Sequence, residues 1–168
     1  MTFASLTPAF TARIPIHPPN AVGSAKGGLN HVALISLAEG NGGSFTSDPA
    51  YPIQISAKIL HGADYIRPDV DGKHLRLKVN SILQQGDALL HYEYTGTIEV
   101  TPAIGKVLSG APDAATTPFG NVFTHVTFES GHALFAPLEF KTFVGSGRFV
   151  VEAGKPVIVE YLISEVTA

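Results

Sequence analysis

Apolar and polar residues alternate along two adjoining segments, 74–83 and 88–100, which the turn-forming sequence QQGD separates. Successive side chains of a β-strand point to opposite faces, so this alternation predicts a hairpin with one apolar and one polar face. If Gln85 and Gly86 form a two-residue loop, the facing pairs are Leu77 with Tyr94, Val79 with Tyr92 and Ser81 with Leu90. The expected inner face consists of Leu75, Leu77, Val79, Ser81, Leu83, Ala88, Leu90, Tyr92 and Tyr94.

Strand-like runs recur along the rest of the chain, at 30–37, 52–60, 121–129, 138–144, 147–152 and 156–166. Turn sequences separate nearly all of them, including a GSG sequence read as a tight hairpin, in a chain with 17 glycines and 12 prolines. No window carries the stripe of an amphipathic helix, and 101–108 could form a short helical turn at most. Strands that no helix covers must bury their inner faces on one another, which favours a closed barrel over a sandwich.

We therefore expect an all-β fold, a single antiparallel β-barrel of about eight to ten strands with little or no helix. The 168 residues suit one domain. We assign residues 30–168 to the barrel and 1–29 to an N-terminal extension that could pack on it.

Composition excludes several classes of function. The net charge is −3 and no basic cluster occurs, so a nucleic-acid partner is not expected. No apolar run reaches the roughly 20 residues of a spanning helix, so a membrane partner is not expected either. The absence of cysteine excludes disulfides and thiolate metal sites. The sequence also lacks a secretory signal, and we expect a cytoplasmic protein.

Six short sequences occur in an order typical of a known family: GGSF at 42–45, GADYIRPDVDG at 62–72, YTG at 94–96, TFESG at 127–131, FVGSGRF at 143–149 and VIVEYLISEV at 157–166. The chain resembles the bacterial and fungal family called domain of unknown function 3237, or UPF0311. The resemblance implies a small lipocalin-like barrel that is often oligomeric, and we expect a homo-oligomer, with a dimer favoured. Some fungal relatives look like cyclases or isomerases of secondary metabolism. Leu77 and Val79 replace polar residues of the family, which implies a more apolar pocket.

The segment 60–72, LHGADYIRPDVDG, holds Asp64, Arg67, Asp69 and Asp71 within eight positions. We expect the preceding strand to end at Leu60, and Asp69 and Asp71 to form a turn. Asp64 and Arg67 are three residues apart and point to opposite faces of an extended segment, so they form an ion pair only if the chain bends. Either they face a ligand at the barrel rim, or Asp64 accepts backbone N–H bonds while Arg67 packs across the mouth.

Two further groups are candidates. Glu129 ends a strand beside a glycine turn, where a rim position is natural; His125 shares its face about 13 Å away, too far for direct cooperation. Tyr92, Tyr94 and Tyr161 are expected to point inward, as core side chains or as phenols that hydrogen-bond a ligand oxygen. No two histidines have the spacing of a metal site, and we expect neither metal nor cofactor.

The leading hypothesis is a barrel that binds a small hydrophobic, oxygenated aromatic or polyketide-like metabolite and acts as a cofactor-free isomerase, cyclase or lyase. The expected catalytic residues are Asp64, Arg67, Tyr92 and Glu129. The expected ligand-binding residues are Tyr94, Ser81, Leu77, Val79, Thr124, Phe128 and Tyr161. A non-catalytic carrier and a structural module with a filled barrel are the alternatives.

Overall fold

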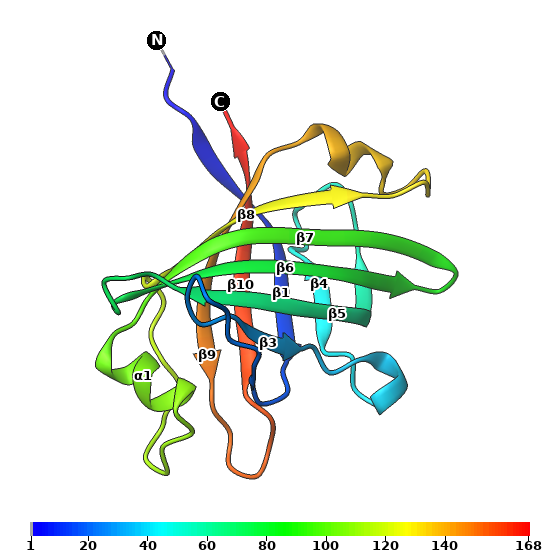
Figure 1. Ribbon diagram of the computed structural model, residues 1–168. Helices are drawn as coiled ribbons and strands as arrows, with labels where there is room; N and C mark the ends of the chain where they lie inside the picture. Colours follow the sequence, from blue (N-terminus) through cyan, green and yellow to red (C-terminus); the bar gives the residue numbers. More distant parts are fainter. Residues whose placement is uncertain (1) are drawn as a thin grey trace.

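A computed structural model of the protein describes residues 2–168 and shows that strands dominate this part of the chain (Figure 1). The strands are β1 (Ser5–Pro15), β2 (Asn20–Ala21), β3 (Asn30–Ala33), β4 (Ser44–Ser47), β5 (Ser56–Pro68), β6 (His74–Gln85), β7 (Ala88–Glu99), β8 (Val122–Glu129), β9 (Phe143–Val150) and β10 (Ile158–Thr167). The helical elements are α1 (Pro102–Leu108) and two short 3-10 helices, η1 (Leu37–Glu39) and η2 (Ala136–Phe140).

The strands form one antiparallel sheet that closes on itself. Its order is β2-β3-β5-β4-β1-β10-β9-β8-β7-β6, and β6 pairs again with β5. The result is a closed eight-stranded barrel, as predicted, in which β4 pairs with the beginning of β5 and β3 with its later part. Figure 1 shows β5, β6 and β7 crossing in front of β1, β9 and β10, with α1 beside one end of the barrel.

The hairpin of β6 and β7 has the predicted faces but a different register. Gln85 pairs with Ala88, so the loop is Gly86-Asp87 and not Gln85-Gly86. Gly86 has φ +60°, and a type II′ turn places its glycine at the first loop position. The observed pairs are Leu77 with Gly96, Val79 with Tyr94 and Ser81 with Tyr92. Each partner has moved by two residues, which keeps every side chain on its predicted face.

The N-terminal segment differs from its expected place outside the barrel. Strand β1 is one of the barrel strands, paired with β10 over most of its length and with β4 from Phe10 to Arg13. Pro8 obscured it in the sequence because proline is unusual within a strand. The structure accommodates Pro8 at a register irregularity between Pro8 and Phe10, where the ladder with β10 is interrupted.

Three further predicted boundaries are wrong. Strand β5 does not end at Leu60 but continues to Pro68, with a register shift between Ile59 and His61. The GSG sequence is not a hairpin, because β9 runs straight through it. Leu138 lies in η2 and not in a strand.

A cluster of aromatic rings lies among the aliphatic side chains of the interior. Phe10 contacts Phe45, Tyr51, Phe128 and Phe143, with ring centroids 5.0–5.6 Å apart. Helix α1 begins at the N-cap Thr101, whose hydroxyl accepts a hydrogen bond from the Ile104 N–H, and buries Ile104 and Val107. Within residues 2–168, no helix is long and apolar enough to span a bilayer.

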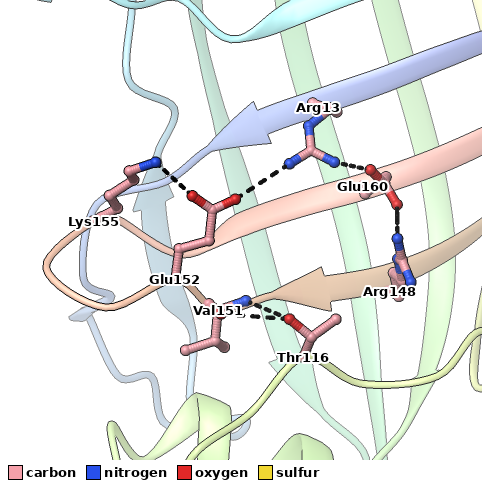
Figure 2. A network of polar contacts seen from close by, with 7 residues as sticks. All are labelled: Arg13, Thr116, Arg148, Val151, Glu152, Lys155 and Glu160. Atoms are coloured by element: carbon pink, nitrogen blue, oxygen red, sulfur yellow. Dashed lines mark hydrogen bonds and ion pairs between the residues drawn. The ribbon is translucent and has the colours of Figure 1, made fainter.

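On the outside of the barrel, Glu160 of β10 links this strand to the strands on both sides of it, β1 and β9 (Figure 2). Its carboxylate, only 8% exposed, lies between Arg13 of β1 and Arg148 of β9 and is bonded to both. Arg148 also lies over the ring of Phe119, 4.7 Å from its centroid. These charges are therefore paired with one another on the outer surface.

Candidate functional site

Asp64 is a carboxyl group inside the barrel with no ion-pair partner among the described residues. It points inward from β5, and only 9% of the residue is exposed. The backbone N–H of Lys78 donates to its Oδ1 at 3.1 Å. Burial dominates and raises the pKa of Asp64 to about 7, so the group can gain or lose a proton near neutral pH.

Two phenols lie close to Asp64. Tyr94 of β7 and Tyr161 of β10 have ring centroids 5.1 Å apart, in an edge-to-face arrangement. Burial, with the nearby Asp64 charge, raises the pKa of both phenols above the usual value of 10. Both therefore stay protonated and can donate hydrogen bonds to a ligand oxygen.

Tyr92 lies beside this pair, its ring centroid 5.1 Å from that of Tyr94. Its hydroxyl is buried and has no hydrogen-bond partner in the part of the chain that the structure describes. Burial also raises the pKa of this phenol well above 10. Tyr92 is thus a neutral phenol packed against the ring of Tyr94.

Glycines on the inner face of β9 make room for Tyr161. A Cβ atom at Gly147 would lie 2.5 Å from Cε1 of Tyr161, and one at Gly145 would lie 2.4 Å from the hydroxyl oxygen of Thr124. Real Cβ atoms do not approach other atoms so closely, so both positions require glycine for this packing. The GSG sequence therefore serves the position of the Tyr161 ring and not a turn.

Asp64, Tyr94 and Tyr161 border a small cavity inside the barrel. Its volume is about 40 Å³, and its other walls are apolar, including Ile14, Leu34, Leu77 and Ile98. A space of this size holds a water molecule or a small functional group and not a whole metabolite.

A larger groove lies next to the cavity, at the end of the barrel where α1 packs. Its volume is about 670 Å³, within the range of small-molecule sites. Its walls are mainly apolar, with Pro18, Pro19, Ile35, Val107 and Val157 among them. Ile16, Leu108 and Phe149 line both spaces and form the boundary between them.

The structure brings some of the predicted site residues together and separates others. Asp64, Tyr94, Tyr161 and Leu77 border the cavity. Tyr92, Ser81, Val79, Thr124 and Phe128 are buried in the barrel without bordering it. The Ser81 hydroxyl donates to the Tyr92 carbonyl at 2.7 Å, so it already has a partner.

Arg67 and Glu129 lie on the outside. Both are exposed, and Glu129 lies 3.8 Å from the Nδ1 of His91 on the outer surface. The alternation along β5 sends Asp64 inward and Arg67 outward, and the strand does not bend enough to bring the two together. Sequence reasoning missed the groove residues Ile16, Leu108 and Phe149, which come from separate elements and share no local pattern.

The fold and this interior define an antiparallel β-barrel with an ionisable carboxyl and two phenols at an inner cavity. The chain belongs to the family of proteins of unknown function DUF3237, whose profile matches residues 4–166. This confirms the resemblance seen in the sequence.

Solved structures with the same fold come from bacteria and a fungus. A conserved protein of unknown function from Rhodopseudomonas palustris has a TM-score of 0.74 and 19% identity, covering 99% of this chain and 100% of that one. A β-barrel-like protein from Acinetobacter baumannii has a TM-score of 0.68 and 17% identity, covering 99% and 98%. An enzyme from Penicillium herquei has a TM-score of 0.58 and 14% identity, covering 97% and 96%. At these identities the likeness shows the fold alone, and a comparison with curated proteins finds no match.

Proposed function

We propose that the barrel binds a small oxygenated aromatic or polyketide-like molecule and catalyses a cofactor-free proton-transfer reaction on it, of the isomerase, cyclase or lyase type. The observation that carries this proposal is Asp64, a buried carboxyl with a pKa raised to about 7 that borders a cavity beside two neutral phenols. A general acid or base works best when its pKa lies near the working pH.

The cavity and the groove have complementary roles in this proposal. The ligand body lies in the apolar groove, and a carbonyl or enol oxygen reaches past Ile16, Leu108 and Phe149 into the cavity. Tyr94 and Tyr161 donate hydrogen bonds to that oxygen, which stabilises negative charge as it develops. Asp64 removes or returns the proton. Arg67 and Glu129 have no part in this mechanism because their side chains lie outside.

The likeness to an enzyme from Penicillium herquei supports a catalytic role only as far as the shared barrel goes. A non-catalytic carrier would use the same groove, whose walls are mainly apolar. The two functions respond differently when the carboxyl of Asp64 is replaced by a group that cannot transfer a proton. This replacement would lower the affinity of a carrier or leave it unchanged, whereas it would lower the turnover of an enzyme.

The test uses benzoylacetone, an aromatic β-diketone whose enol and keto forms differ in ultraviolet absorbance. We expect the protein to bind it, measured by calorimetry, and to accelerate the interconversion of its two forms. Asp64→Asn should reduce the acceleration about 100-fold while binding persists. Asp69→Asn, a carboxylate in the outer turn bonded to Arg76, is the matched control and should have no effect. Binding without acceleration would identify a carrier, and absence of binding would contradict both functions.

A further inference from the structure

His17 borders the same apolar groove, at a place that the proposed mechanism does not use. It follows β1 and is succeeded by Pro18 and Pro19, which also line the groove. Its backbone N–H donates to the Ala33 carbonyl at 2.9 Å. The main chain around His17 is thus held on both sides, since proline fixes its own φ.

A carboxylate orients the imidazole of His17. Its Nε2 lies 2.7 Å from Oε1 of Glu39, whereas no described residue is hydrogen-bonded to its Nδ1. A neutral imidazole carries one proton, and the carboxylate beside Nε2 holds that proton there. The lone pair is then on Nδ1, which can accept a proton.

Glu39 is itself fixed in place. Its Oε2 accepts hydrogen bonds from the Ser36 N–H at 2.8 Å and from the Ser36 hydroxyl at 2.7 Å, which forms the capping box of η1. These bonds and the nearby imidazole lower the pKa of Glu39 to about 2. Ser36, Glu39 and His17 therefore form a chain in which an ionised carboxylate holds the ring.

Lys155 is the other charged group at the groove. Its ammonium is bound by Glu152 at 2.6 Å, and Glu152 also faces Arg13 at 3.8 Å (Figure 2). This cation is already paired on the outer surface. Among the described groove residues, His17 is left as the group that can take a proton.

We propose that His17 is a second catalytic base, positioned by Glu39, that removes a proton from the outer end of the ligand in the groove. This inference rests on the proposed function, because it needs an aromatic ligand in the groove. Nδ1 of His17 takes the proton of an acidic C–H or O–H group, and the electron pair of that bond stays on the ligand as an enolate or phenolate. The imidazolium later returns the proton. The preferred ligand thus carries an oxygen at its inner end and an acidic group at its outer end.

The test uses 5-nitrobenzisoxazole, a flat apolar molecule with one acidic C–H bond. When a base takes that proton, the N–O bond breaks, a nitrile forms and coloured 2-cyano-4-nitrophenolate is released. We expect the protein to catalyse this elimination, with a rate that falls at low pH because imidazolium accepts no proton. His17→Gln should lose about 100-fold of the protein-dependent rate and Glu39→Gln about 10-fold.

The protein offers a closely matched control. His74 is bonded to Asp71 at 2.6 Å, with 38% and 42% of the two side chains exposed, against 43% and 45% for His17 and Glu39. Asp71 lies in the turn before β6, His74 is the first residue of that strand and neither lines the groove, so His74→Gln should keep the full rate. A His17→Gly variant should regain activity when free imidazole is added, which a purely structural role would not produce.

The test of His17 does not depend on the outcome for Asp64. Equal rates for His17→Gln and His74→Gln, or no catalysis above buffer, would overturn the role of His17. The benzoylacetone experiment with Asp64→Asn would still decide the proposed function. Loss of benzoylacetone binding would instead overturn the ligand groove itself.

Discussion

Asp64→Asn should remove part of the pH dependence of folding stability. Asp64 has a pKa of about 7 in the folded protein and an ordinary value of 3.8. Between these values the folded chain binds more protons than the unfolded chain, so the free energy of unfolding falls as pH rises. At 1.36 kcal/mol for each unit of pKa, the ionised carboxylate costs about 4 kcal/mol above pH 7. Asn keeps the acceptor for the Lys78 N–H and never ionises.

The measurement is urea unfolding of both proteins at pH 4.5 and pH 8. The stability of Asp64→Asn relative to the wild type should rise by about 3 kcal/mol between these two pH values, since the remaining titrating groups cancel. Asp69→Asn is the control, because Arg76 lowers the pKa of Asp69 below 3.8, so this group is ionised at both pH values and its difference from the wild type should stay nearly constant between them. A difference between wild type and Asp64→Asn that stays constant with pH would refute the assignment of a raised pKa.

Two further substitutions test the packing around the phenols. Tyr92→Phe should leave stability unchanged or raise it by about 1 kcal/mol in urea unfolding, because the lost hydroxyl is buried without a partner; a clear loss would show that it has one. Gly147→Ala should destabilise the protein by about 1–3 kcal/mol, since the new methyl group collides with Tyr161. Tyr161→Leu in the same background should recover part of that loss, and no recovery would place the strain elsewhere.

The sequence predicted the faces of the strands better than their ends. The two-residue period of β6 and β7 placed Leu77, Ser81 and Tyr94 inward even though the register was wrong, because a shift of two residues preserves the face. It also placed Asp64 and Arg67 on opposite faces. Alternation is a local property of the pleated strand, so it can be read from neighbouring residues alone.

The features that the sequence did not predict depend on contacts between residues far apart in the chain. Gly145 and Gly147 resemble a turn when seen alone, and only the ring of Tyr161 from another strand explains why they belong in β9. The His17–Glu39 pair joins residues that the sequence separates by 22 positions. Neither relation follows from a local pattern.

The pairing of β1 with β10 has a consequence for folding during synthesis. Ser5 pairs with Thr167, so the ladder between β1 and β10 can form only after β10, the last strand of the barrel, has been synthesised. Until then the apolar inner faces of the other strands remain uncovered, and the free edges of β1 and β9 can recruit a strand from another molecule. Because such distant contacts form slowly, we expect chaperone dependence in the cell to be set by this closing step and not by the local hairpins.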